Sequence, residues 1–267
     1  MRGRQVVLGH IAEKKVAALQ IDGKLHDVLF EDSSQLPIGT ILRAVVERPV
    51  KGIGGVMLQL PNGHGFLKKA NGLAPGQTVT VQLSGFSEAG KANPVTQRVI
   101  FKSRYAIVTP NQPGVNISRK ITSEKLQDEL TLLAKSAMDG CEMGLIIRSS
   151  AAEAEMSEVA EDIQVMRETA EDIATQQGLK PEILMDGDNP HVQAWREWSD
   201  VKTVLTQSDD LEASGVLDQI EATQSSWVQL GSGGMYIEET KAMIAVDINT
   251  GSDFSRAAAL KLSLIHI

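Results

Sequence analysis

Five short β-like runs between residues 36 and 101, separated by glycine, restrict the fold more than any other part of this sequence. In chain order they read GTILRAVVERPV, GGVMLQL, HGFLKKA, QTVTVQLSGF and PVTQRVIF. A short strand leaves backbone groups unpaired at a sheet edge, and a barrel avoids this by closing the sheet on itself. Five strands at this spacing therefore predict a small antiparallel barrel.

The same segment is basic, although the whole chain of 267 residues carries a net charge of −8. Between Leu36 and Ile121 there are eleven basic and two acidic residues, a balance of +9, which leaves −17 for the remainder. This asymmetry indicates a nucleic-acid partner, because neutralised phosphates supply affinity; a basic domain facing an acidic neighbour is the alternative. We expect an OB-type barrel in which Phe66 either stacks on a base or lies in the core. The basic residues are Arg43, Arg48, Lys51, Lys68, Lys69, Lys91, Arg98, Lys102, Arg104, Arg119 and Lys120.

The first 35 residues have the pattern of a β-meander. The runs QVVLGHI, KVAALQI and KLHDVLFE are partly alternating, and Asp22-Gly23 between the last two is a strong hairpin signal. Three strands of this length are too few to hold a core alone. We therefore expect the meander to pair with a later part of the chain.

From Tyr105 onward, strand-like and helical runs alternate, which indicates an α/β segment in which the meander could find its missing sheet. RYAIVTP, MGLIIRS, EILM and VKTVL are strand-like, SEKLQDELTLLAKSA is helical, and another helix should open at Asn189-Pro190 and run through Trp198. A long helix begins near Ser157, with one apolar face formed by Val159, Ile163, Met166, Ala170 and Ile173. Its acidic residues are predicted to form a solvated surface: Glu158, Glu161, Asp162, Glu168, Glu171 and Asp172.

Two stretches could carry chemistry. In IIRSS, Arg148 is followed by the hydroxyls of Ser149 and Ser150, a combination suited to binding a phosphate, although a surface arginine near a turn is the alternative. In GGMYIEETKAMIAVDI, two strands should turn about Glu239-Thr240, and the apolar run before Asp247 predicts a buried strand that ends in a rigid carboxylate.

Asp247 is suited to binding a divalent cation such as Mg²⁺, which prefers one or two carboxylates together with waters and substrate phosphate. Asn249, two residues on, would point the same way and could contact a phosphate or a metal-bound water. A capping or turn aspartate is the alternative. The lone cysteine, Cys141, excludes an internal disulfide framework and a cysteine-based zinc site within this chain.

Composition is that of a globular protein, with 42% hydrophobic and 22% charged residues. No apolar run approaches the roughly 20 residues that a membrane span requires, and the start turns charged too soon for a signal peptide. We therefore expect no membrane span and a cytoplasmic location.

Several of these stretches, in this order, resemble the ribonuclease E/G family. SGGMYIEETKAMIAVDINTG is similar to the family's catalytic strand pair, and HGFLKKA resembles its RNA-binding barrel. RYAIVTPNQPGVNISRKI resembles the entry to its 5′-end sensor, and MGLIIRSS is similar to the segment that binds a 5′-monophosphate. The resemblance spans nearly the whole chain. It implies a Mg²⁺-dependent endoribonuclease that cleaves single-stranded RNA in RNA processing, including rRNA processing, or in RNA decay; the alternative is a non-catalytic RNA-binding protein.

The resemblance also implies an α+β multidomain fold. A split RNase H-like subdomain, formed by residues 1–35 and 186–225, would enclose an OB-fold RNA-binding β-barrel at 36–102 and an α/β 5′-sensor at 103–185. The start of a DNase I-like catalytic subdomain would follow at 226–267.

Residue roles carried over from the family fall on seven positions. The catalytic pair would be Asp247, as magnesium ligand, and Asn249, at the scissile phosphate. The RNA contacts of the barrel would be Phe66 and Lys91, and the 5′-phosphate would be bound by Arg148, Ser149 and Arg119.

The chain departs from the family pattern in several respects. The barrel's second RNA-facing aromatic falls on Val56, which predicts weaker stacking there. The family's second metal-binding aspartate and its zinc-binding cysteine pair lie beyond the end of this chain, which comes twenty residues after Asp247. The final LSLIHI continues no family pattern and resembles translated adapter sequence. We therefore expect an inactive fragment of an enzyme that, in full length, forms homo-oligomers through parts this chain lacks.

Overall fold

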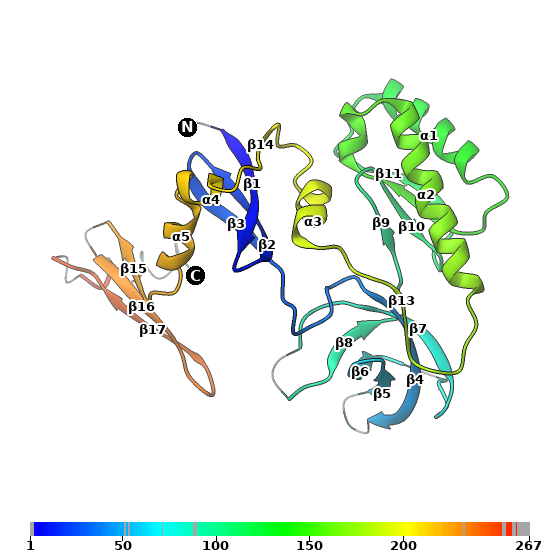
Figure 1. Cartoon of the computed structure of the whole chain (residues 1–267), viewed down its shortest axis with the longest axis horizontal. Helices are drawn as coiled ribbons and strands as arrows, with labels where there is room; N and C mark the ends of the chain where they lie inside the picture. Colours follow the sequence, from blue (N-terminus) through cyan, green and yellow to red (C-terminus); the bar gives the residue numbers. More distant parts are fainter. Residues whose placement is uncertain are drawn as a thin grey trace.

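The computed structural model describes residues 3–50, 52, 54–70, 72–87, 90–231, 233–252, 255–257 and 260. The described residues form a mixed α and β protein with four sheets, laid out in Figure 1. Lys51, Glu88 and the final LSLIHI lie outside the described residues.

The opening meander forms as predicted and pairs with a distant strand. Asp22 and Gly23 have φ angles of 52° and 78°, the positive values that a two-residue hairpin turn needs. A short strand adds parallel to β1, with Gln5 opposite Thr203, which confirms that the meander pairs with a later part of the chain. The strands are β1 (Arg4–Ile11), β2 (Lys14–Ile21), β3 (Lys24–Phe30) and β14 (Thr203–Leu205).

Helices cover both faces of this sheet, because alternate residues of a strand point to opposite sides. On one face, Ala194 packs with Val6 and Leu19; on the other, Leu211 packs with Val7. The helix that carries Ala194 begins at Asn189, whose side chain accepts hydrogen bonds from two backbone N–H groups, with proline at the first helical position, as predicted. The helices are α3 (Pro190–Glu197), α4 (Asp210–Ala213) and α5 (Val216–Ala222).

The five basic-segment strands close into a barrel, as predicted, and the result is consistent with an OB-like fold. The ring runs β4, β5, β6, β8, β7 and back to β4. Inward-pointing residues from all five strands form its core: Leu42, Ala44, Val46, Val56, Leu58, Leu60, Leu67, Val79, Val81, Leu83 and Val95. The strands are β4 (Ile41–Val50), β5 (Gly55–Leu60), β6 (Gly63–Lys68), β7 (Thr78–Leu83) and β8 (Asn93–Thr96).

Two details of the predicted barrel are wrong. The barrel is not wholly antiparallel: β6 and β8 run parallel, with Phe66 opposite Pro94, because a closed ring of five strands cannot alternate direction all the way round. The run PVTQRVIF is not one strand either. It leaves the barrel after Thr96, and Phe101 joins another core. Strand β13 (Glu182–Met185), the predicted EILM, pairs with β4 of the barrel.

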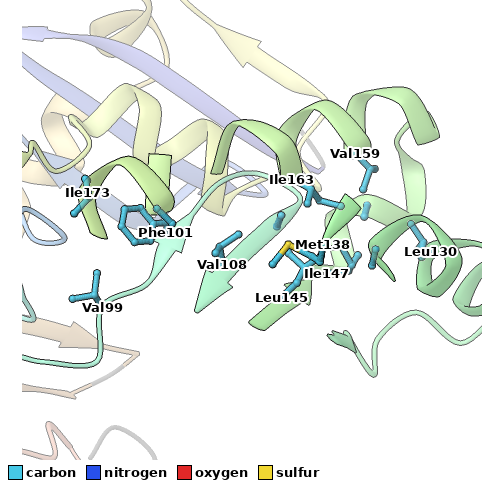
Figure 2. Packing of buried hydrophobic residues seen from close by; sticks show 14 of the residues in the cluster. Val99, Phe101, Val108, Leu130, Met138, Leu145, Ile147, Val159, Ile163 and Ile173 are labelled. Atoms are coloured by element: carbon cyan, nitrogen blue, oxygen red, sulfur yellow. The ribbon is translucent and has the colours of Figure 1, made fainter. Parts of the chain in front are cut away.

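A second α/β unit follows the barrel, with a sheet of order β11, β12, β10, β9 covered by two helices. Figure 2 shows its core, where Ile163 of the long helix lies near Val108 and Ile147 of the sheet. The predicted apolar face of that helix is buried, apart from Met166, which is half-buried. The elements are β9 (Phe101–Lys102), β10 (Ala106–Thr109), β11 (Gly114–Ile117), α1 (Glu124–Ala137), β12 (Gly144–Ile147), η1 (Ser149–Glu153) and α2 (Met156–Thr175).

The last sheet contains the predicted strand pair, but the apolar residues before Asp247 are not buried as predicted. Strands β15 (Trp227–Leu230), β16 (Gly233–Glu239) and β17 (Ile244–Asn249) follow one another, and β17 pairs only with β16 among the described residues. Ile244 is 67% exposed and Val246 41% exposed. The apolar run before Asp247 was expected to be buried, which is wrong: β17 is the edge strand of its sheet among the described residues, and these side chains are exposed to solvent. Of the helices in the described part of the chain, none is both long and apolar enough to cross a membrane.

Candidate functional site

Phe66 lies on the outside of the barrel. Its neighbours Gly65 and Leu67 are buried, so the strand's alternation turns the ring outward, where it is half-buried and takes no part in the barrel core. The ring lies against Gly55 of β5: a Cβ atom there would stand 2.5 Å from the ring's Cζ, so only glycine allows this approach. The alternative of a core phenylalanine is therefore excluded by the geometry.

Val56 does not share the surface of Phe66. It is 3% exposed, lies in the barrel core and pairs with Leu67, so its assignment to an RNA-facing position is wrong. Met57, half-buried, lies directly opposite Phe66 instead. Alternation along GGVMLQL would have revealed this, because the pattern that buries Val56 and Leu58 turns Met57 outward.

Polar and basic side chains border the pair formed by Phe66 and Met57. Lys68 is exposed two residues after Phe66 on the same strand face. His64 lies two residues before Phe66 on that face, with its Nδ1 3.2 Å from the Glu47 carboxylate. Lys91 is exposed just before β8 begins. This surface offers apolar contact area beside the ammonium group of Lys68, which suits single-stranded nucleic acid.

Arg148 follows β12 and turns toward helix α3 rather than toward open solvent. Its Nη1 donates to the carbonyl oxygens of Ser103, at 2.5 Å, and Arg196, at 3.2 Å. Its Nη2 donates to Oε2 of Glu197 at 2.8 Å. The side chain is 15% exposed, so the guanidinium is enclosed by acceptors from the chain itself.

Glu197, the last residue of α3, is the centre of this cluster. While Oε2 accepts from Arg148, Oε1 accepts from Nζ of Lys102 at 2.7 Å and from Nε of Arg196 at 2.8 Å. Burial is the largest influence and raises the pKa of Glu197. The hydrogen bonds and charges of its three cationic partners together outweigh it, so the pKa lies below its ordinary value. Sequence reasoning missed this residue, because a glutamate at a helix end looks like solvated surface.

Asp162 orders the loop that presents one of the acceptors to Arg148. Its carboxylate accepts from Oγ of Ser103 at 2.5 Å and from the backbone N–H of Tyr105 at 2.9 Å. It was predicted to belong to a solvated acidic surface, which is wrong, since it is half-buried against the loop between β9 and β10. Arg104 of that loop donates to the carbonyl of Trp195 at 2.6 Å, which places another cation at the C-terminal end of α3.

The other two predicted phosphate-binding residues are exposed and leave the sheet at the same end as Arg148. Strands β11 and β12 run parallel, with Ile117 opposite Ile147. Arg119 therefore follows one strand where Arg148 and Ser149 follow the other. No hydrogen bond or ion pair of the Arg119 side chain occurs with any other described residue.

Asp247 and Asn249 lie on one face of β17, opposite Tyr236 and Gly234 of β16. Both are exposed, and Oδ1 of Asn249 accepts the backbone N–H of Gly251 at 2.9 Å, which leaves its Nδ2 free to donate. Within the described ranges, no three histidine, cysteine, aspartate or glutamate side chains gather in a way that could hold a metal ion. An exposed carboxylate beside an amide is still compatible with Mg²⁺, which keeps several waters and binds substrate phosphate.

The structure does not bring the predicted sites together. In Figure 1, β15–β17 lie at the left, and the sheet of β10 and β11, the two neighbours of β12, lies at the upper right with the barrel below it. The strand with the predicted RNA contacts, the cationic cluster around Glu197 and the exposed aspartate strand are thus three separate places on one chain.

The fold and these places define a mixed α+β protein built around a closed five-stranded barrel. The sequence model of the ribonuclease E/G family matches residues 101–212 and 197–264. The chain belongs to the ribonuclease E/G family, which confirms the resemblance.

Curated relatives agree with this assignment. The chain is 24% identical to ribonuclease E of Nostoc sp. (strain PCC 7120) over 98% of its own length and 45% of that protein. It is 23% identical to ribonuclease E of Synechocystis sp. (strain PCC 6803), covering 91% of the chain and 44% of the relative. It is 26% identical to ribonuclease G of Haemophilus influenzae, covering 66% and 43%. The chain spans less than half the length of these relatives.

Proposed function

We propose that this chain carries the RNA-binding part, and the aspartate strand of the catalytic part, of a single-strand-specific endoribonuclease of RNA processing or decay. One observation carries the proposal: the family match runs through both the sheet that ends in Arg148 and the strand that holds Asp247. The outward pair of Phe66 and Met57 supports it, because half-buried apolar side chains on a basic barrel surface suit unpaired bases.

We further propose the family's subdomain arrangement for this chain. The sheet of β1–β3 and β14, with helices on both faces, supports the split RNase H-like subdomain. The closed barrel supports the OB-fold, and the unit of β9–β12 with α1 and α2 supports the 5′-sensor. Strands β15–β17 would be the first part of the DNase I-like subdomain.

In the proposed mechanism Asp247 is a ligand of Mg²⁺, which when bound lowers the pKa of water and offsets charge that develops on a phosphate. The Asp247 carboxylate is suited to this because it makes no hydrogen bond or ion pair with the other described residues. Asn249 can donate from Nδ2 to a phosphate oxygen, since its Oδ1 is held by Gly251. Its turn with Gly251 thus fixes which end of the amide faces the substrate.

The proposed 5′-end sensor is formed by Arg148, Ser149 and Arg119. All three follow parallel, neighbouring strands and therefore lie at one sheet end. A guanidinium with a nearby hydroxyl is suited to binding a terminal phosphate at two points. A 5′-monophosphate would then be preferred over a 5′-hydroxyl.

The test is cleavage of a 5′-monophosphorylated single-stranded RNA in Mg²⁺ by the full-length protein. We expect Asp247→Ala to abolish cleavage while RNA binding is retained. Glu239→Ala is the matched control, since it removes another exposed carboxylate from the same hairpin and should cleave normally. Normal cleavage by Asp247→Ala would remove the catalytic assignment.

The second candidate is a non-catalytic RNA-binding protein. It is favoured by the exposed aspartate strand, which belongs to no group of three or more metal-ligating side chains among the described residues. Full-length wild-type protein that binds the RNA and leaves it intact in Mg²⁺ would establish this candidate in place of the first.

A further inference from the structure

Three cations converge on one carboxylate where the sheet β9–β12 meets α3. Lys102, Arg148 and Arg196 all contact Glu197, and Arg196 also pairs with Asp188. Three positive and two negative charges leave a surplus of one positive charge. The three cations are between 15% and 30% exposed, so the surplus is only partly screened by water. A partly buried cationic surplus favours an additional or a more highly charged anion.

The cluster can be reached from solvent. A cleft of about 610 Å³ between the barrel and α3 is lined by Lys102, Arg196 and Glu197 of the cluster, together with Arg98 and the carboxylates of Asp186 and Asp188. Its wall therefore combines part of the cluster with an exposed arginine of the basic segment. Glu197, which lines this cleft, is also the carboxylate paired with Arg148.

We propose that Glu197 occupies the place of a phosphate group, and that a terminal RNA phosphate displaces it and binds Lys102, Arg148 and Arg196. This inference rests on the proposed 5′-end sensing, and it adds Lys102 and Arg196 to the phosphate-binding residues. The two oxygens of Glu197 already accept charge-assisted bonds from all three cations. A terminal phosphate presents three acceptor oxygens and up to two negative charges, so it is the stronger ligand for the same donors. Glu197 then makes the site selective, because an anion binds only if it displaces the Glu197 carboxylate from the three cations.

The test measures binding of two short single-stranded RNAs that differ only at the 5′ end, one with a monophosphate and one with a hydroxyl, in EDTA so that no cleavage occurs. Glu197→Gln keeps the shape of the side chain and removes its charge. We expect it to bind the monophosphate RNA about fivefold tighter or more, the lower end of usual coupling between competing events, with the hydroxyl RNA unchanged. Glu171→Gln is the matched control, because it removes another helix carboxylate, paired with Arg167 at 2.8 Å, and should change neither affinity.

A second variant decides the matter if Glu197→Gln fails to fold. Lys102→Gln, at a partly exposed position, should weaken binding of the monophosphate RNA and leave the hydroxyl RNA unchanged. Unchanged or weaker monophosphate binding by a folded Glu197→Gln variant overturns the proposal. So does a Lys102→Gln variant with wild-type preference. If wild type prefers the monophosphate and these variants do not alter the preference, only the displacement of Glu197 fails. If wild type and all variants bind the two RNAs with equal affinity, the proposed 5′-end sensing fails as well.

Discussion

Arg148 and Glu197 form an ion pair of 2.8 Å although they lie 49 residues apart in the sequence. The pair joins the exit of β12 to the last residue of α3, the helix that packs on the sheet of β1–β3. A residue proposed to sense the RNA end therefore also links two parts of the fold through an ion pair.

The variants Arg148→Ala and Arg119→Ala should differ in their free energy of unfolding. Loss of Arg148 removes three acceptor contacts, and a hydrogen bond to a charged group contributes about 1.5–3 kcal/mol, so the free energy of unfolding should fall by at least that much. Arg119 is exposed, and its replacement should leave stability unchanged. Both variants should lose the preference for a 5′-monophosphate. Urea unfolding and RNA binding measure the two effects, and equal stability of both variants would contradict the structural role of Arg148.

The contribution of Glu197 to stability should depend on pH. Burial alone would raise the pKa of this carboxyl group, but its cationic partners lower it below the ordinary value of 4.5. A group whose pKa is lower in the folded chain stabilises the fold fully above its unfolded pKa, and this contribution is lost as the pH falls through the folded pKa. The difference in free energy of unfolding between wild type and Glu197→Gln should therefore be largest near neutrality and shrink below about pH 4.5. A difference that stays constant across this range would show that the charge is not involved.

Adjacent residues of β6 should have opposite phenotypes. Phe66→Ala should weaken binding of single-stranded RNA, because stacking on an aromatic ring contributes about 1–3 kcal/mol per base. Leu67→Ala should instead lower the free energy of unfolding by about 2–5 kcal/mol, as expected for a truncated core leucine, with RNA affinity of the folded protein retained. Met57→Ala should act like Phe66→Ala, more weakly. Fluorescence anisotropy measures RNA affinity and urea unfolding measures stability. A Phe66→Ala variant with wild-type RNA affinity would contradict the proposed stacking of bases on Phe66.

Asp162→Asn should destabilise the protein. An asparagine cannot supply the charge-assisted bonds that the carboxylate makes to Ser103 and Tyr105, which should cost about 1–3 kcal/mol. Asp172→Asn changes an exposed position on the same helix and should be nearly neutral. Urea unfolding of the two variants makes the comparison. An equally small effect of both would support the original prediction that Asp162 is a solvated surface residue.

Local patterns predicted most elements, because alternation, turn residues and capping act over a few neighbouring residues. Asp22-Gly23 forms its hairpin, and Asn189 caps α3. The parallel pairing of β6 with β8 was beyond such patterns, since it follows from closing an odd-numbered ring. Burial of β17 was predicted from its apolar residues alone, but burial also needs a covering element.

The candidate site divides in the same way. The outward direction of Phe66 follows from alternation, whereas the choice of Met57 over Val56 needs the strand register. Asp162 and Glu197 could not be identified from the sequence as contacts of the region around Arg148. Their partners Ser103, Arg148 and Lys102 lie 49 to 95 residues away in the sequence. A carboxylate on a helix has the same local pattern whether water or an arginine faces it.

The parallel pairing of Gln5 with Thr203 has a consequence for synthesis of the protein. Strand β1 is synthesised roughly 200 residues before its partner β14, so the barrel and the unit of β9–β12 can fold before this pairing forms. The edge of β1 that later pairs with β14 is exposed during this interval, and an unpaired strand edge invites association with other chains. The sheet of β1–β3 is thus completed only after the barrel and the unit of β9–β12 have been synthesised, and until then the open edge of β1 is a site at which the nascent chain can aggregate.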